Sequence, residues 1–343
     1  MSVTTGSRPG HAGGRQVPSF VPHPLVRNGH LQTIVGRFVL ASRPGLTSTD
    51  HLVEVSDGDR LLVHESVPPN WAAGDPVAIL VHGLSGSAQS PYVIRLALRL
   101  RKKGVRVVRM NLRGAGAGFG LARGIYHAGR SDDVRRVAEW AADRTGNSRL
   151  ALVGFSLGGN LVLKLAAEAN QEPVAGLDCV VAANPPIDLA ACCRAIQRRS
   201  NRIYDRNFVR QLRSDIERLH RRFPELGPVS FPKSMTVYGF DELYTAPRNG
   251  FAGADDYYAR SSAGPLIPSI GHPGLVVHSE DDPFVPAEPF KSLRFPERLA
   301  LELIPGGGHL GYVSHNRFEG DRRWLDSRLS AWLSDRWSLN SSA

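Results

Sequence analysis

Short continuous runs of apolar residues recur along the chain, and longer segments with helical periodicity separate them. Continuous apolar runs are typical of strands that are buried on both faces of a sheet. The runs that we predict as strands cover residues 77–81, 105–110, 150–153, 178–182, 274–279 and 299–304. Helices are predicted over residues 92–103, 131–144, 157–167 and 321–337. Because strands alternate with helices, the pattern predicts an α/β fold whose mostly parallel sheet has helices on both faces.

Two regions depart from this alternation. Residues 51–55 and 60–65 alternate apolar and polar positions around an Asp-Gly turn signal, which predicts an antiparallel hairpin at the sheet edge. Between residues 188 and 265 the strand-helix rhythm lapses, because the first half is helical and rich in arginine and the second half is aromatic and irregular. The predicted organisation is a flexible tail (1–20), an α/β core (21–187 and 263–343) and a cap inserted between two sheet strands (188–262).

Composition narrows the class of protein. A hydrophobic fraction of 42% and an aromatic fraction of 8% are those of a soluble globular protein. The formal net charge is +10, and the basic residues are nearly all arginine, since only five of the 42 are lysines. These arginines are spread over several predicted helices, whereas a nucleic-acid interface would gather them on one face with interleaved aromatic residues. We therefore expect no nucleic-acid partner, and weak peripheral contact with anionic lipid is a secondary expectation.

Cysteine and histidine positions indicate the compartment and argue against a metal. Cys179, Cys192 and Cys193 form neither an even disulfide framework nor a Cys-x-x-Cys pair, which is typical of a reducing compartment. No signal peptide and no run of about 18 apolar residues occurs, so a cytoplasmic, unanchored protein is predicted. His23 and His30 have no partner at metal-ligand spacing, and we expect neither a metal nor a cofactor.

The most informative motif is Gly-Phe-Ser-Leu-Gly at residues 154–158, between a predicted strand and a predicted helix. This arrangement is typical of a nucleophile elbow, in which a serine occupies a sharp and strained turn. Gly154 and Gly158 fit such a turn because a Cβ at either position would collide with the neighbouring strand or helix. The helix N-terminus would favour negative charge developing beside the hydroxyl. Ser156 is therefore the predicted nucleophile.

A serine hydroxyl needs a base, and the base needs a carboxylate. His309 lies in a glycine-rich loop after the last predicted strand, from which its imidazole could reach over the sheet edge. The loop after residues 274–279 contains adjacent carboxylates, and we favour Asp282 over Asp281 because it directly precedes a proline. Asp281 would then be a turn or capping residue. The order serine, acid, histidine is that of α/β-hydrolases.

The loop that follows residues 77–81 is expected to supply the fourth part of the active site, which binds the oxyanion. Its sequence is His-Gly-Leu-Ser-Gly at residues 82–86. Acyl transfer creates an oxyanion that two backbone N–H groups should receive, and we predict those of Leu84 and Leu157. His82 is expected to be a structural hydrogen-bonding residue, because His309 occupies the better position for the base.

Together these motifs resemble one family, the YheT-like α/β-hydrolases. The resemblance spans about residues 22–335 and is specific, because Arg-Asn-Gly-His-Leu-Gln-Thr at residues 27–33 is not a general hydrolase feature. The motifs that carry it lie at residues 27–33, 82–87, 111–114, 154–160, 241–242, 245–247, 257–258, 261–262 and 281–284. The resemblance implies a serine hydrolase of carboxylic esters with Ser156, Asp282 and His309 as its catalytic triad. Asp282 also matches the Asp-x-x-Val-Pro pattern that is usual in the family.

The sequence therefore predicts a carboxylic ester hydrolase acting through an acyl-enzyme on a small-molecule ester. The aromatic residues between 231 and 258 suggest an apolar acyl pocket, and short- to medium-chain esters or monoacylglycerols are the expected substrates. Thioesters are an alternative. A second class remains open, a non-catalytic protein that keeps the fold and binds a small hydrophobic ligand in the capped cleft.

Overall fold

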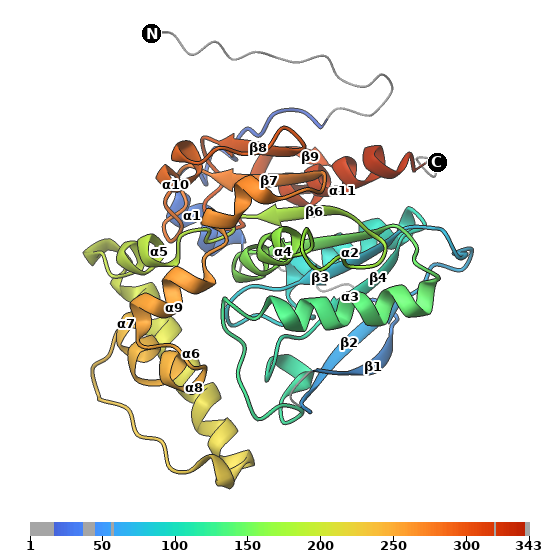
Figure 1. Ribbon diagram of the computed structural model, residues 1–343. Coiled ribbons are helices and arrows are strands. Elements are labelled where there is room, and N and C mark those ends of the chain that lie inside the picture. The colour runs from blue at the N-terminus through green and yellow to red at the C-terminus, as the bar shows by residue number, and fades with distance from the viewer. Residues whose placement is uncertain (1–16, 37–44, 56–57, 319, 340–343) are drawn as a thin grey trace.

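The computed structural model describes residues 17–36, 45–55, 58–318 and 320–339 (Figure 1). Its centre is an eight-stranded sheet with the order β1-β2-β4-β3-β5-β6-β7-β8. The strands are β1 (Thr49–Glu54), β2 (Arg60–Ser66), β3 (Val77–Val81), β4 (Arg106–Met110), β5 (Leu150–Phe155), β6 (Leu177–Ala183), β7 (Gly274–Ser279) and β8 (Leu299–Ile304). The hairpin of β1 and β2 pairs antiparallel with β4, and the other neighbouring strands are parallel. The predicted fold class is confirmed.

Helices cover both faces of the sheet because successive side chains of a strand point to opposite faces. Along β3, Ala78 and Leu80 belong to the core under α2 (Pro91–Lys102) and α11 (Trp324–Trp337). Val77, Ile79 and Val81 belong to the opposite core, under α3 (Ser131–Thr145) and α4 (Leu157–Glu168). All five β3 residues are completely buried. The continuous apolar run at residues 77–81 therefore corresponds to a strand with two buried faces.

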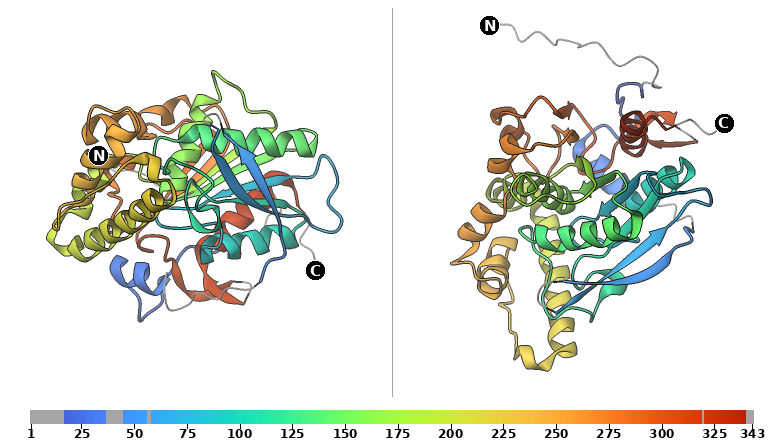
Figure 2. Two further views of the ribbon diagram at one scale, coloured as in Figure 1. Left: turned by 90° about the horizontal axis from the view of Figure 1, so that it is seen from below. Right: turned by 45° about the vertical axis from the view of Figure 1, so that its right-hand side comes forward.

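The segment between β6 and β7 lies beyond the carboxyl ends of the parallel strands, beside the core (Figures 1 and 2). Its helices are α5 (Leu189–Ile196), α6 (Arg202–Arg222), α7 (Val237–Phe240), a π-helix (Asp241–Thr245), α8 (Ala246–Arg248) and α9 (Ala254–Ser261). Residues 231–262 were expected to be irregular, but they contain the last four of these helices. Ile216, Leu219, Phe240 and Tyr244 form a small core of their own, against which Phe231 packs. Aromatic packing thus stabilises helices too short to show periodicity in the sequence.

Two elements near the sheet edge were not predicted. One is the short helix α1 (Gly29–Ile34), and the other is a hairpin of β9 (Val313–Phe318) and β10 (Asp321–Arg323). Because β10 takes the first three residues of the helix expected at 321–337, that helix begins at Trp324. The remaining short helices are Gly116–Gly118, Arg199–Asn201, Pro224–Leu226, Gly264–Ser269 and α10 (Glu288–Ser292).

Most of the predicted tail and the tip of the predicted hairpin, residues 56–57, lie outside the described residues. Residues 17–20 are described and pack against the core. The ring of Phe20 meets those of Tyr312 and Trp324, each at a centroid distance of 5.6 Å. The indole N–H of Trp324 donates to the Pro18 carbonyl at 2.7 Å. The described end of this segment is therefore attached to the C-terminal part of the core.

Candidate active site

Ser156 stands at the junction of β5 and α4, with φ 53° and ψ −124°. A non-glycine residue with positive φ is strained, and such strain is typical of functional turns. The two flanking glycines make the turn sterically possible. A Cβ on Gly154 would lie 2.2 Å from the Gly158 carbonyl oxygen, and a Cβ on Gly158 would lie 2.4 Å from the Val81 carbonyl oxygen. The turn has the geometry expected of a nucleophile elbow.

The structure brings the three side chains predicted for catalysis into one hydrogen-bonded chain. His309 Nε2 lies 2.8 Å from Ser156 Oγ, and His309 Nδ1 lies 2.7 Å from Asp282 Oδ2. Asp282 follows β7 and His309 follows β8, so both groups extend from the same edge of the sheet as Ser156. The Asp282 side chain is fully buried, and that of His309 is 14% exposed. This arrangement allows the imidazole to accept the serine proton while the carboxylate orients the ring.

Asp282 is kept ionised although it is buried. Burial alone would raise the pKa of its carboxyl group, but the charge of His309 and hydrogen bonds from His309 and the Phe284 amide outweigh burial and lower that pKa. The amides of Phe284 and Val285 donate to Oδ1 at 2.8 and 3.1 Å. The side-chain amide of Asn184 donates to Oδ2 at 2.7 Å. A carboxylate with this many donors is suited to stabilise an imidazolium.

Asp281, the alternative acid, has different partners. Its Oδ1 accepts from the Ser279 hydroxyl at 2.5 Å and from the Gly308 amide at 2.8 Å. Gly308 directly precedes His309, so Asp281 supports the backbone of the histidine loop while Asp282 contacts the imidazole. The two adjacent carboxylates therefore hold the same loop at two different points.

Sequence reasoning missed two groups that support the histidine. Asn184 follows β6 with φ 46°, and its side-chain amide bridges Asp282 and the Gly308 carbonyl at 3.2 Å. Thr33 of α1 accepts from the His309 amide at 2.8 Å and donates to the Gly29 carbonyl at 2.6 Å. The signal for Thr33 was the unusual motif at residues 27–33, which the sequence analysis used only as evidence of family resemblance.

The motif at residues 27–33 is closely fitted to the active-site loops. Asn28 caps α1 by accepting from the Leu31 amide at 2.8 Å. Gln32 is completely buried and exchanges hydrogen bonds with the backbone of Val313, at 2.7 and 3.1 Å. A Cβ on Gly29 would overlap the Asp281 carbonyl oxygen at 1.8 Å, so only glycine allows this approach. The helix therefore holds the acid and histidine loops from the outside.

The predicted oxyanion donors belong to two segments that lie next to Ser156. Leu157 is the first residue of α4, where an amide has no partner within the helix. Gly83, next to Leu84, lies so close to the nucleophile that a Cβ there would be 2.8 Å from Ser156 Cβ. The neighbouring Ser85 amide donates to the Tyr126 hydroxyl at 2.8 Å, which holds this loop in place. Within the described part of the chain, neither the Leu84 nor the Leu157 amide donates to a protein acceptor.

His82 is a neutral structural residue. Its Nδ1 donates to the Gly83 carbonyl at 2.8 Å, and its Nε2 accepts from the Leu112 amide at 3.1 Å. Burial lowers the pKa of this imidazole to about 4, and its backbone hydrogen bond offsets only part of that effect. His82 therefore keeps one tautomer at neutral pH and anchors the loop that contains Leu84.

A cluster of aromatic rings begins at His309 and extends to the segment between β6 and β7. Phe284 meets the imidazole edge-to-face at 5.0 Å, and Tyr204 of α6 meets Phe284 at 4.6 Å. Phe208, one turn further along α6, also contacts Phe284. His30 of α1 stacks on Tyr204 at 5.7 Å. These rings lie outside residues 231–258, whose aromatic residues Phe231, Phe240 and Tyr244 instead pack in the small core of the segment between β6 and β7.

The described residues contain no group of three or more His, Cys, Asp or Glu side chains that could hold a metal ion. All three cysteines are buried and free. No helix in the described ranges is long and apolar enough to span a membrane.

Comparison with known proteins agrees with this fold. The model of a family described as alpha/beta hydrolase fold matches residues 76–316. The solved structure of the α/β hydrolase GrgF from Penicillium sp. sh18 superimposes with a TM-score of 0.59 at 19% sequence identity, covering 86% of this chain and all of that one. Fold, elbow and family model together define the class of the protein: it is a member of the α/β-hydrolase family.

Two curated relatives narrow the class further. The chain is 32% identical over 319 residues to the putative esterase YheT of Escherichia coli (strain K12), with 92% of each chain covered. It is 27% identical to a monoacylglycerol lipase of Saccharomyces cerevisiae, covering 75% of this chain and 59% of the relative. The chain therefore belongs to the YheT-like α/β-hydrolases, as its motifs predicted. The predicted enzyme class, a carboxylic ester hydrolase, agrees with the names of both relatives.

Proposed function

We propose that the protein is a metal-independent serine hydrolase of carboxylic esters. The observation that carries the proposal is the continuous chain of hydrogen bonds from Ser156 through His309 to Asp282, built on a strained serine turn. A protein that only binds a ligand has no need of strain at Ser156. The geometry therefore supports an enzyme over a non-catalytic ligand-binding protein.

The mechanism follows from the positions of the groups. Ser156 Oγ attacks the acyl carbon while His309 Nε2 takes its proton, and His309 then returns the proton to the leaving alcohol. Asp282 stabilises the imidazolium and keeps its orientation. The amides of Leu84 and Leu157 receive the oxyanion, and water then releases the acyl group by the same steps. Loss of one oxyanion donor typically costs about 10²–10³ in turnover.

Short- to medium-chain esters and monoacylglycerols are the proposed substrates. The monoacylglycerol lipase among the relatives supports an acylglycerol. The rings of Tyr204, Phe208 and Phe284 beside His309 supply apolar surface for an acyl chain. Residues 188–262, between β6 and β7, would act as the cap of this site.

The proposal is tested by labelling with a fluorophosphonate probe. The wild-type protein should be labelled at Ser156, and Ser156→Ala should lose the label while keeping its melting temperature within a few degrees. Ser292→Ala, which changes a serine at the end of α10, is the matched control and should be labelled like the wild type. An unlabelled wild-type protein, or a label that survives in Ser156→Ala, contradicts a serine hydrolase.

Peripheral contact with anionic lipid is part of the proposal. Arg199, Ile203, Arg206 and Arg210 follow one another at helical spacing near the start of α6, and all four are exposed. Ile203 has 79% of its surface exposed. Its neighbour Tyr204 reaches toward His309 through Phe284, so this strip borders the active site. Basic residues around an exposed apolar side chain are suited to an anionic membrane surface.

A further inference from the structure

The loop after β3 contains Leu84, whose amide is proposed to bind the oxyanion. The amides on either side of it are already engaged by tyrosine hydroxyls. The Gly83 amide donates to the Tyr92 hydroxyl at 3.1 Å, and the Ser85 amide donates to the Tyr126 hydroxyl at 2.8 Å. In the part of the chain that the structure describes, the Leu84 amide has no protein acceptor. Of these three successive amides, that of Leu84 is therefore the one left for a substrate oxygen.

The conformation of this loop needs support from outside. Ser85 has φ 56°, which is unfavourable for a residue with a Cβ. The hydrogen bond from its amide to Tyr126 offsets this cost. On the other side of Leu84, His82 Nδ1 donates to the Gly83 carbonyl at 2.8 Å. An oxyanion donor must lie about 3 Å from the oxygen that it stabilises, so a small shift of the loop would weaken the interaction.

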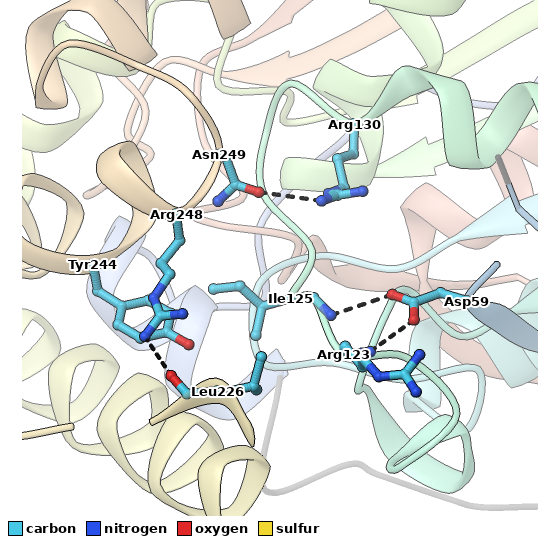
Figure 3. A pocket seen from close by; sticks show the side chains of 9 residues that line it. Asp59, Arg123, Ile125, Arg130, Leu226, Tyr244, Arg248 and Asn249 are labelled. Atoms are coloured by element: carbon cyan, nitrogen blue, oxygen red, sulfur yellow. Dashed lines mark hydrogen bonds between the residues drawn. The ribbon is translucent and has the colours of Figure 1, made fainter. Parts of the chain in front are cut away.

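Tyr126 belongs to the segment at residues 123–130, which is itself held at both ends (Figure 3). At its start, Asp59 accepts from two successive backbone amides of the segment, at 2.9 and 3.2 Å. At its end, Arg130 donates to the Asn249 side-chain oxygen at 3.2 Å. Residues of the same segment line the pocket that Figure 3 shows. The ring of Tyr126 therefore extends from a fixed backbone.

The same segment is attached to the helix of the nucleophile elbow. Asn160 of α4 is completely buried, and its side-chain amide donates to the Ala128 carbonyl at 2.9 Å. The Ala128 amide in turn donates to the Tyr257 hydroxyl at 2.9 Å. Leu157, the second proposed oxyanion donor, is the first residue of α4. Through Tyr126 and Ala128 the segment thus connects the loop of one oxyanion donor to the helix of the other.

We propose that the hydroxyls of Tyr92 and Tyr126 position the Leu84 amide for the oxyanion. This inference rests on the proposed ester hydrolysis, because the oxyanion forms in that reaction. Both tyrosines are positioning residues, since they act through the backbone of the loop. A phenol oxygen can accept from an amide while its ring is held by packing. Burial raises the pKa of Tyr126, so the phenol stays neutral and adds no negative charge beside the oxyanion.

The first experiment measures hydrolysis of a p-nitrophenyl ester by Tyr126→Phe and, separately, by Tyr92→Phe. Each change keeps the ring and removes the acceptor of one loop amide. In each variant kcat should fall at least about tenfold, as part of the 10²–10³ that loss of an oxyanion donor typically costs. KM should stay within about twofold, because misplacement of a catalytic group affects turnover more than binding. Melting temperatures within a few degrees of the wild type show that the variants are folded.

Tyr257→Phe is the matched control. It removes the same kind of hydrogen bond, between a phenol oxygen and a backbone amide, two residues further along the segment. Ala128 stays attached to Asn160 through its carbonyl, so the position of Tyr126 should be preserved. The kcat of this variant should remain within about twofold of the wild type. An equal loss in Tyr257→Phe and Tyr126→Phe would mean that general loosening of the segment, and not the Tyr126 hydroxyl, affects turnover.

The second experiment tests the oxyanion directly with a trifluoromethyl ketone inhibitor. The Ser156 oxygen adds to its carbonyl carbon, the serine proton passes to His309, and the former carbonyl oxygen becomes an oxyanion like that of the reaction. Its Ki should rise at least about tenfold in Tyr126→Phe and Tyr92→Phe, in parallel with the fall in kcat. The corresponding methyl ketone stays largely trigonal, and its Ki should change less than about twofold.

The outcomes separate this inference from the proposed function. A tyrosine variant that keeps the wild-type kcat and the wild-type Ki for the trifluoromethyl ketone shows that this tyrosine does not position the amide. If both variants do so, the proposal is wrong. Equal increases in Ki for the two ketones would also contradict it, because the loss would then concern binding in general. A wild-type protein that neither hydrolyses the ester nor reacts with a fluorophosphonate contradicts the proposed function itself.

Discussion

Asp281 and Asp282 are neighbours with the same functional group, yet their surroundings give them separate tasks. Asp282 contacts the imidazole of His309, whereas Asp281 contacts the amide of Gly308. The difference arises from the turn after β7, in which the amides of Phe284 and Val285 fold back onto Asp282. At the scale of single residues, hydrogen-bond partners determine which acid can stabilise a charged histidine.

Substituting each acid by asparagine tests this division. Asp282→Asn should lower kcat by about 10³–10⁴, because a neutral amide neither stabilises the imidazolium nor favours the correct tautomer. Asp281→Asn preserves shape and an acceptor, so its kcat should fall by less than about tenfold. Both are measured with a p-nitrophenyl ester, and each variant is the control for the other. If Asp281→Asn loses more kcat than Asp282→Asn, Asp281 and not Asp282 is the acid that stabilises the imidazolium.

At the scale of elements, α1 contacts the loops of both Asp281 and His309. It holds the His309 amide through Thr33, and Gly29 fits against the carbonyl of Asp281. A short helix of six residues has little stability of its own, so its position depends on Gln32 and the backbone of Val313. Small displacements of the helix would move the histidine relative to Ser156.

We predict that Thr33→Val lowers kcat about tenfold with little change in KM, because the valine cannot accept from the His309 amide. Misplacement of a catalytic group typically affects turnover more than binding. Thr33→Ser keeps the hydroxyl and should restore most of the activity. If the serine variant is as slow as the valine variant, packing by the methyl group, and not the hydrogen bond, positions the loop.

The π-helix Asp241–Thr245 contains a buried acid whose titration should change the free energy of unfolding. Asp241 is 8% exposed and accepts from the Tyr258 hydroxyl at 2.7 Å. Burial raises the pKa of its carboxyl group from 3.8 to about 6, although hydrogen bonds from Tyr258 and Thr245 oppose this. The folded protein therefore holds this proton more tightly than the unfolded chain does.

The stabilising contribution of Asp241 to the free energy of unfolding is therefore fully present below pH 3.8 and is lost as pH rises through about 6. The difference corresponds to about 3 kcal/mol of unfolding free energy. Asp241→Asn does not titrate, so its unfolding free energy relative to the wild type should rise by up to this amount between pH 4 and pH 7. Urea unfolding at several pH values measures it, with the exposed Glu172→Gln as control. If the difference in unfolding free energy between the wild type and Asp241→Asn does not change with pH, the pKa of Asp241 is not raised in the folded protein.

At the scale of the whole molecule, the proposed contact with anionic lipid depends on the exposed arginines near the start of α6. The double variant Arg206→Gln, Arg210→Gln should weaken binding to anionic vesicles about 10- to 30-fold at low salt, at about 1 kcal/mol for each charge. Arg221→Gln, Arg222→Gln removes the same charge from the other end of α6 and should have little effect. Sedimentation with anionic and zwitterionic vesicles measures both. Equal losses in the two variants would indicate only a net-charge effect.

The sheet and its helices could be predicted because their signals are local. The runs at Val77–Val81, Gly274–Ser279 and Leu299–Ile304 match β3, β7 and β8 residue for residue. β3 and β7 are buried along their whole length, whereas β8 is the edge strand and is mostly half-buried, so its run also includes Glu302. Hairpin β9–β10 escaped prediction because β9 has exposed polar residues in its second half, and β10 is only three residues long. The short helices between β6 and β7 were missed because aromatic contacts within that segment, and not periodicity, stabilise them.

By itself the sequence determined the serine turn and the order of Ser156, Asp282 and His309 along the chain. The turn could be predicted because its steric requirement for Gly154 and Gly158 involves residues that are neighbours in the sequence. Only the tertiary structure decided which groups meet. Thr33 and His309 are 276 positions apart, and Asn184 and Asp282 are 98 apart. Hydrogen bonds join atoms about 3 Å apart, and the sequence positions of two residues do not show whether folding brings them that close.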